Sequence, residues 1–268
     1  MPVDQPFNLY RDQLTSQYHG NALWNPNPVE GLYDFGRVSI GDVGYLCDGD
    51  FIRMFNVTLP WDNPSNAKLG IPEGFESLEQ GPFVNVRHSR FPEAVYHSPY
   101  VSKEENAGNP HAATPDELVM VLSQTTSIYT YFRFGRYKGQ TYKCRNRSHG
   151  ALLSLPHGGR REDVIQSKAF RDYIREHVDS WFTWAQNHNL EVERVEDLIL
   201  VTGCTLVSSW AAAAFDDTSP IDATSISLDA QKLNGGGAEF SWRNIRGNVE
   251  YHNSHFNPVR SYVYVFSP

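Results

Sequence analysis

Cysteine is scarce in this chain of 268 residues, which carries only Cys47, Cys144 and Cys204. A small, odd number of cysteines does not fit a disulfide framework, so we expect a reducing compartment. The chain also lacks any apolar run near the ~18–20 residues that a membrane-spanning helix requires. Its first residues show no basic segment followed by an apolar one, which is the pattern of a secretory signal. We therefore predict a cytoplasmic protein.

Common catalytic and metal-binding signatures are missing as well. The sequence has no Gly-x-Ser-x-Gly, no Gly-x-Gly-x-x-Gly, no phosphate loop, no Cys-x-x-Cys and no His-Glu-x-x-His. His252 and His255 have the spacing of two metal ligands on a helix, but Asn253 and the step Asn257-Pro258 predict turns there. We therefore expect neither a metal ion nor a cofactor.

Composition nevertheless favours a folded protein with a substantial core. Hydrophobic residues make up 40% of the chain and aromatic residues 13%, and this length can form one large domain. Sixteen prolines and twenty glycines predict many turns. The net charge of −8 argues against a general affinity for nucleic acid.

The clearest element is an amphipathic helix predicted at about 162–188. Glu162 and Asp163 would lie in its first turn, where the helix dipole favours negative charge, and 187–189 would end it. We expect Trp181 and Phe182 to anchor the helix in the core. Its apolar residues recur with the 3.6-residue period of a helix that has one buried face, and they are Phe170, Tyr173, Ile174, His177, Val178, Trp181, Phe182 and Ala185.

Most of the remaining chain consists of short β-favouring segments separated by turn residues. One helix among many strands predicts a β-rich α+β fold, with mixed or antiparallel sheets packed on the long helix. Residues 1–36 are expected to form an N-terminal arm packed on the core through Leu23, Trp24, Tyr33 and Phe35, and 37–268 a single α+β domain. The predicted strands include 37–47 and 51–59, joined by a tight turn and with a bulge or two-sided burial in the second, then 83–87, 151–155, 197–202, 207–215, 225–230, 238–242 and 260–266. Residues 88–117 are expected to be irregular.

Three motifs carry a family resemblance: Ile40-Gly41-Asp42-Val43-Gly44-Tyr45, then Phe51-Ile52-Arg53-Met54-Phe55-Asn56-Val57, then Leu200-Val201-Thr202-Gly203-Cys204 with Ser208-Ser209-Trp210-Ala211. They resemble a family of uncharacterised proteins from mushroom-forming fungi, over most of the chain. The resemblance implies no activity, cofactor or catalytic residue for transfer. Where that family often has polar residues after the cysteine, this chain has Thr205-Leu206-Val207, which favours a packed strand over a polar catalytic loop.

Charge is unevenly distributed, because residues 118–161 contain eight basic residues and no acidic one. Within this stretch, 129–134 and 140–147 are expected to pair as a hairpin that interleaves cations with aromatic rings. Such a surface can bind phosphates or an anionic membrane, and a solvated sheet face balanced by acids elsewhere is the alternative interpretation. The predicted ligand-binding residues are Tyr131, Arg133, Arg136, Lys143, Arg145 and Arg147.

Cys204 and His149 are the candidates for a catalytic site. A nucleophilic cysteine needs a nearby histidine and an electropositive setting, whereas a buried cysteine is usually inert. The segment His157-Gly158-Gly159 is interpreted as a turn before the helix.

The sequence thus favours a non-enzymatic intracellular binding or effector domain, in fungal defence or self-recognition, with an anionic membrane or a phosphate-bearing partner. Its order of helix, strand, Gly-rich hairpin and terminal aromatic strand resembles the N-terminal domain of gasdermin pore-formers in layout alone. The alternatives are an enzyme with a loop-built His, Cys and Tyr site and a glycan-binding module with exposed aromatic residues. The sequence does not determine the ligand, the sheet order or the oligomeric state.

Overall fold

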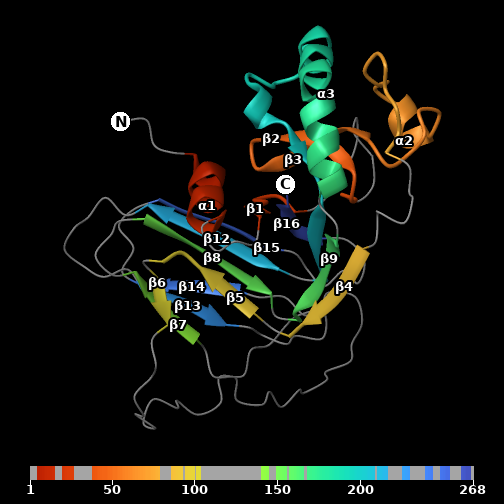
Figure 1. Cartoon of the computed structure of the whole chain (residues 1–268). Helices are drawn as coiled ribbons and strands as arrows, with labels where there is room; N and C mark the ends of the chain where they lie inside the picture. The colour runs from red at the N-terminus through yellow and green to blue at the C-terminus, as the bar shows by residue number, and fades with distance from the viewer. Residues whose placement is uncertain are drawn as a thin grey trace, which may run out of the picture.

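Figure 1 shows the computed structural model of the chain. Fifteen segments are described, and of 101–103, 140–144 and the segments beyond 214 only the backbone is described. Within them lie the helices α1 (Pro6–Thr15), α2 (Pro64–Ala67) and α3 (Lys168–Asn187) and the short 3-10 helix η1 (Val195–Asp197). The described residues are 5–15, 20–26, 38–78, 86–92, 94–99, 101–103, 140–144, 149–155, 157–165, 168–208, 210–216, 225–229, 239–243, 248–253 and 261–266.

The described strands form four sheets in which every pair of neighbours is antiparallel. This result confirms the predicted α+β class and selects antiparallel sheets. The first sheet has the order β1 (Asn21–Ala22), β16 (Ser261–Phe266), β11 (Gly203–Val207), β9 (Gly159–Val164) and β4 (Val86–Phe91). The second is β10 (Ile199–Leu200), β2 (Asp42–Cys47) and β3 (Asp50–Asn56); the third is β15 (Asn248–Asn253), β12 (Ala211–Asp216), β8 (His149–Leu155) and β5 (Ala94–His97); the fourth is β14 (Glu239–Arg243), β13 (Ser225–Asp229), β7 (Gln140–Cys144) and β6 (Val101–Lys103).

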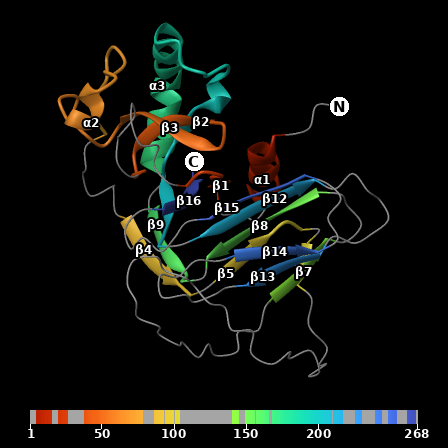
Figure 2. The same ribbon diagram turned by 180° about the vertical axis from the view of Figure 1, so that it is seen from behind.

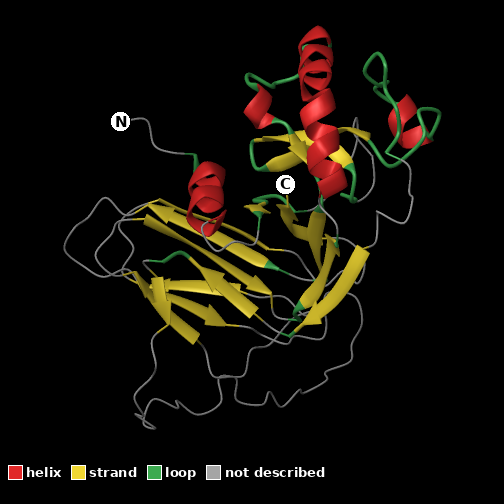
Figure 3. Cartoon of the chain, in the orientation of Figure 1, coloured by secondary structure: helices red, strands yellow, loops and turns green. Residues whose placement is uncertain are grey.

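The elements separate into an upper and a lower part in the views of Figures 1 and 2. Helix α3, helix α2 and the β2–β3 hairpin lie together at the top, and the third and fourth sheets lie one above the other below. Helix α1 lies on the third sheet (Figure 3), where Tyr10 and Leu14 pack against Ala151, Leu153 and other small or aliphatic side chains. The opposite face of the third sheet is also buried, so its strands β8 and β12 read as continuous apolar runs.

Helix α3 holds the upper part together through aromatic contacts. Trp181 is 1% exposed, and its ring meets Phe55 of β3 edge-on with centroids 5.7 Å apart. Phe55 also meets Trp184 edge-on, with centroids 5.8 Å apart. The prediction that Trp181 anchors the helix is confirmed, and Phe182 packs against the same core while remaining partly exposed.

The C-terminal end of α3 lies where the sequence predicts it, but the N-terminal end does not. Asn189 has a φ of 52°, and the amides of Asn189 and Leu190 donate to the carbonyls of Gln186 and Ala185, which is a Schellman ending. The helix begins at Lys168 rather than near 162, because 159–164 forms strand β9 between β4 and β11. Glu162 and Asp163 therefore lie in a strand and not in a first helical turn. His157 and Gly158 form a turn as expected, but it leads into β9.

The hairpin of β2 and β3 follows the prediction closely. Asp48 and Gly49 have φ angles of 49° and 87°, as a two-residue type I′ turn requires. Val43 pairs with Phe55 and Gly44 with Arg53, so Met54 is an extra residue in β3. This confirms the bulge expected in the second strand.

The N-terminal segment is more than an arm, because it contributes helix α1 and strand β1, which pairs with β16. Leu23 and Trp24 are buried as predicted, whereas Tyr33 and Phe35 lie outside the described residues. The strand predicted at 207–215 is wrong in its limits, since β11 ends at Val207 and β12 begins at Ala211. Similarly, the segment predicted as a strand at 197–202 holds only the two-residue β10, and its first residue, Asp197, is the end of η1.

Replacing Trp181 with alanine tests the anchoring of α3. We expect Trp181→Ala to lower the free energy of unfolding by about 3–5 kcal/mol, because a fully buried indole is removed from the core. The exposed Glu176→Ala on the same helix should change it by less than about 0.5 kcal/mol. Urea denaturation followed by circular dichroism measures both, and equal losses would contradict the assignment.

Candidate anion-binding site

The predicted basic hairpin falls almost entirely outside the described residues. Tyr131, Arg133, Arg136, Arg145 and Arg147 are not described, and Lys143 is described by its backbone in β7. At Lys143 the strand pairs with Ser102 of β6 on one side and with Ser225 of β13 on the other. Both edges of β7 are taken at this point, so the predicted pairing with 129–134 is wrong there.

The acid-free basic segment does reach the described structure at its far end, in strand β9. Arg160 and Arg161 are the last basic residues of that segment. Strand β9 lies between β11 and the outermost strand β4, which itself carries Arg87, His88 and Arg90. Because side chains alternate between the two faces of a strand, these cations divide between two surfaces.

One surface places two arginines directly opposite each other. In the register of β4 and β9, Arg90 pairs with Arg160, and both residues are exposed. Directly opposed like charges destabilise an antiparallel pair, since their Cβ atoms lie only about 4.5–5.5 Å apart. The arrangement is therefore unfavourable unless a negative charge lies close to both guanidinium groups.

Among the described residues of β4 and β9, Glu162 is the carboxylate on this face, and it pairs with only one of the two arginines. Glu162 Oε1 is 2.6 Å from Arg160 Nη2 and 3.5 Å from Nδ1 of His88, its cross-strand neighbour. Arg90 forms no ion pair within the described part of the chain. We call Arg90, Arg160, His88 and Glu162 the edge cluster, in which positive charge exceeds negative.

Burial differs strongly within the edge cluster, which makes the site rigid at its base and open at its rim. The Glu162 side chain is 9% exposed, because it lies opposite Cys204 on the inner strand β11. The His88 and Arg160 side chains are 58% and 44% exposed. A fixed carboxylate thus orients Arg160 and His88, while their remaining N–H groups face solvent next to Arg90.

On the other face of the same strands, no two arginines of the described residues lie directly opposite each other. Arg161 Nε lies 2.9 and 2.7 Å from the two carboxylate oxygens of Asp163. Burial raises the pKa of Tyr96 in β5, and the positive charge of Arg161 partly offsets that rise. Arg87 lies opposite Asp163 on this face, and Arg161 lies opposite Ser89. Both faces carry two arginines and one carboxylate, but a directly opposed pair of arginines occurs only in the edge cluster.

Sequence reasoning missed Arg90 and His88 because it predicted a strand only at 83–87 and irregular structure from 88 to 117. The signal was present in the run Val86-Arg87-His88-Ser89-Arg90-Phe91, where apolar residues close both ends of four polar ones. Such a run is typical of an exposed outermost strand, whose polar side chains discourage further pairing.

The two candidate catalytic residues lie in strands of different sheets. Cys204 is 1% exposed in β11 and packs with Leu23, Ile199 and Val201. His149 begins β8, which belongs to a different sheet. Cys204 is thus a buried core residue, in agreement with the structural alternative.

Cys47 is a thiol held in its protonated form. Its Sγ donates to Glu191 Oε2 at 2.9 Å. Burial, followed by the hydrogen bond and the negative charge of Glu191, raises the pKa of Cys47 to about 12. A nucleophilic cysteine needs the opposite environment.

Asp42, at the start of β2, is a buried carboxylate with several hydrogen-bond partners. Its carboxylate accepts from Arg53 Nη1 at 3.2 and 3.4 Å, from Asn56 Nδ2 at 2.7 Å and from the Ser39 amide at 2.6 Å. Asp42 is completely buried and Arg53 is 7% exposed. Burial nevertheless raises the pKa of Asp42 to about 6, against the lowering effect of its partners. The group therefore fixes the hairpin and has no access to a ligand.

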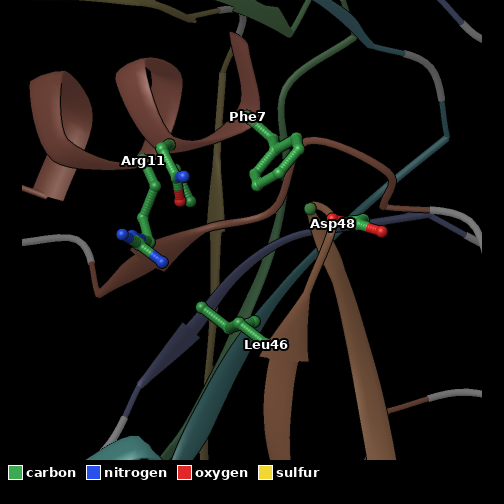
Figure 4. Close-up of a pocket in the computed structure, with 7 residues that line it drawn as sticks. Phe7, Arg11, Leu46 and Asp48 are labelled. Atoms are coloured by element: carbon green, nitrogen blue, oxygen red, sulfur yellow. The ribbon is translucent and has the colours of Figure 1, made fainter. Parts of the chain in front are cut away.

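A small hollow lies where α1 meets the β2–β3 hairpin. Figure 4 shows Phe7 and Arg11 of the helix on one side and Leu46 and Asp48 on the other. Its cavity volume is about 30 Å³, which is far below the range of about 300–1,000 Å³ for typical small-molecule sites. Arg11 is already engaged by Asp12 at 3.1 Å. We interpret the hollow as a seam between two elements.

Two further types of site are not seen where the structure is described. No three His, Cys, Asp or Glu side chains gather there in a way that could hold a metal ion. His252 is described by its backbone in β15, and His255 lies outside the described residues. None of the described helices combines the length and the apolar character needed to cross a bilayer.

Stability should depend on pH through Asp42. Because its pKa is raised from 3.8 to about 6 on folding, the folded state binds this proton more tightly than the unfolded state. The stabilisation is complete below pH 4 and is lost as the pH rises through 6, by about 3 kcal/mol. Urea denaturation of the wild type and Asp42→Asn at pH 4 to 7 measures it. The free energy of unfolding of the wild type, minus that of Asp42→Asn, should fall as the pH rises. A difference that stays constant or rises with pH would contradict the raised pKa.

Cys47 should react slowly with alkylating reagents. At pH 8 we expect its reaction with iodoacetamide to be at least about tenfold slower than that of an unstructured cysteine, because the thiolate is scarce. Glu191→Gln should accelerate the reaction by removing the negative charge. Peptide mass spectrometry separates Cys47 from the other cysteines, and a rate unaffected by Glu191→Gln would be evidence against this contact.

Comparison with known proteins gives no relative for this chain. No protein-family model, no curated protein and no solved structure matches it. What the protein does must therefore be inferred from its own side chains.

Proposed function

We propose that this chain is a non-enzymatic binding domain that holds a phosphate-bearing ligand on the edge cluster. The observation that carries the proposal is the directly opposed pair of Arg90 and Arg160, both exposed, beside a carboxylate, Glu162, that contacts Arg160 and His88. The cytoplasmic location and the role in fungal defence or self-recognition expected from the sequence belong to the same proposal.

The chemistry of the cluster favours phosphate over a single carboxylate. A guanidinium group presents a planar fork of N–H donors that matches two phosphate oxygens. Two such forks beside an imidazole would surround a doubly charged group, and the added negative charge would remove the repulsion between Arg90 and Arg160. A ligand that binds only the folded cluster also stabilises the fold by mass action.

The phosphate could belong to a lipid headgroup or to a free molecule, and both present the same oxygens. The experiment therefore uses two probes: vesicles of phosphatidylcholine with and without phosphatidic acid, and inositol 1,4,5-trisphosphate in solution. Binding to the vesicles alone identifies a membrane surface, and binding to the trisphosphate identifies a free phosphate ligand. Binding to neither probe would overturn the proposal.

Substitution at the cluster tests its residues. We expect Arg90→Gln and Arg160→Gln each to weaken binding by about tenfold or more, since each removes a charge-assisted hydrogen bond. Arg87→Gln is the matched control, because Arg87 is exposed on the same strand but lies on the opposite face. Equal losses of affinity for all three variants would show that binding depends on the net charge of the protein and not on the edge cluster.

Arg90→Gln should also differ from the wild type in thermal stability, both without and with the phosphate probe. Arg90→Gln should raise the thermal midpoint slightly, because it relieves a repulsion of about 0.2–1 kcal/mol. The bound phosphate probe should raise the midpoint of the wild type and not that of Arg90→Gln. Differential scanning fluorimetry measures both effects.

A further inference from the structure

Trp61 is the exception among the tryptophans whose side chains are described. Trp24, Trp181, Trp184 and Trp210 are all 8% exposed or less, whereas Trp61 is 68% exposed. Isolated exposed apolar residues are ordinary on protein surfaces, so exposure alone decides nothing. The structure around Trp61 supplies the second observation.

Trp61 lies at the second position of a turn whose backbone is held by hydrogen bonds. The Asn63 amide donates to the Pro60 carbonyl at 3.1 Å, which closes a four-residue turn. Pro60 and Pro64 stand on either side and restrict the backbone further. The backbone that presents the indole ring therefore has little freedom.

The clamp beneath the turn is Asn66 of α2, which is completely buried. Its Nδ2 donates to the carbonyls of Asn56, Leu59 and Pro60 at 3.0, 3.2 and 3.0 Å. Its Oδ1 accepts from the Asn56 amide at 2.8 Å. The Asn66 side chain thus links Leu59 and Pro60, which precede Trp61, to Asn56 at the end of strand β3. Both the nitrogen and the oxygen of its amide are hydrogen-bonded.

Polar groups frame the exposed ring. Asp62 follows it directly and is exposed, and Asn63 caps α2 by accepting from the Ser65 amide at 2.9 Å. The turn therefore presents an exposed aromatic ring on a restrained backbone, with the exposed Asp62 next to it in the chain. A rigid aromatic ring supplies a large contact area at a low cost in conformational entropy.

We propose that the Trp61 turn is a saccharide-binding site. The ring face would stack on the C–H face of a neutral pyranose, and the Asp62 carboxylate would accept hydrogen bonds from hydroxyl groups at the edge of the sugar. A pyranose has this same division into an apolar face and a polar border. The site is separate from the edge cluster and does not depend on the function proposed for that cluster.

Charge argues for a neutral sugar and against a membrane surface at this turn. Segment 57–78 carries Asp62, Glu73 and Glu76 against the single cation Lys68. Tryptophan also anchors proteins at membrane interfaces, but an acidic surround is repelled by anionic lipids. Carboxylates, by contrast, are strong acceptors for hydroxyl donors.

An array of neutral oligosaccharides tests the proposal, followed by titration of any bound sugar with intrinsic fluorescence. We expect at least one neutral oligosaccharide to bind and to shift the emission of Trp61 toward the blue. Trp61→Ala should lose at least tenfold in affinity, and Trp61→Phe should retain part of it. Because Trp61 is exposed, both variants should keep the circular dichroism spectrum and the thermal midpoint of the wild type.

Ile165→Ala is the matched control, because Ile165 is the other large hydrophobic residue that is well exposed in the described structure, at 53%. Its affinity for the sugar should equal that of the wild type. The proposal is overturned if no neutral oligosaccharide binds, if Trp61→Ala binds as well as the wild type, or if the ring instead mediates binding to phosphatidylcholine vesicles. Arg90→Gln should leave sugar binding unchanged, so failure at the edge cluster and failure here are distinguishable.

Discussion

The buried ion pair of Asp42 and Arg53 is the constraint on which the upper part of the molecule depends. Two charges taken out of water are costly, and only good geometry with further hydrogen bonds offsets that cost. Ser39 and Asn56 supply those bonds, and Asn56 in turn accepts from Thr58. The pair therefore fixes β2, β3 and the chain on both sides of them in one arrangement. Phe55, which meets the aromatic residues of α3, and Asn66, which clamps the Trp61 turn, are both positioned from this hairpin.

Two surfaces follow from this frame and from the first sheet, and they suit different chemistry. The edge cluster is an excess of positive charge at the rim of a β-ladder, with Glu162 held rigidly at its base. The Trp61 turn carries an exposed indole ring and lies in segment 57–78, where acidic residues outnumber basic ones. A phosphate would be attracted to the first surface and repelled by the second, whereas a neutral sugar needs the flat ring and gains nothing from two guanidinium groups.

Elements that depend on neighbouring residues were predicted correctly from the sequence. The wrong predictions concern strands that are defined by pairing with distant parts of the chain. The period of α3, the turn at Asp48-Gly49 and the bulge at Met54 depend on neighbouring residues, and all three were predictable. Glu162 and Asp163 looked like the start of a helix because β9 is recognisable only through its pairing with β4 and β11. For the same reason Arg90 was missed, since its importance arises from Arg160, some seventy residues away in the chain. The burial of Cys204 was anticipated from the apolar residues beside it.

The position of β4 has a consequence for self-association. It is the last strand of its sheet in the described structure, and four polar residues in succession, Arg87 to Arg90, occupy its centre. Unpaired backbone groups on such a strand are a template for another chain, and charged side chains oppose that contact. The arginines for which we propose anion binding thus also oppose the addition of a further strand to the sheet. Any sequence change that makes this strand apolar would exchange a binding surface for an aggregation-prone edge.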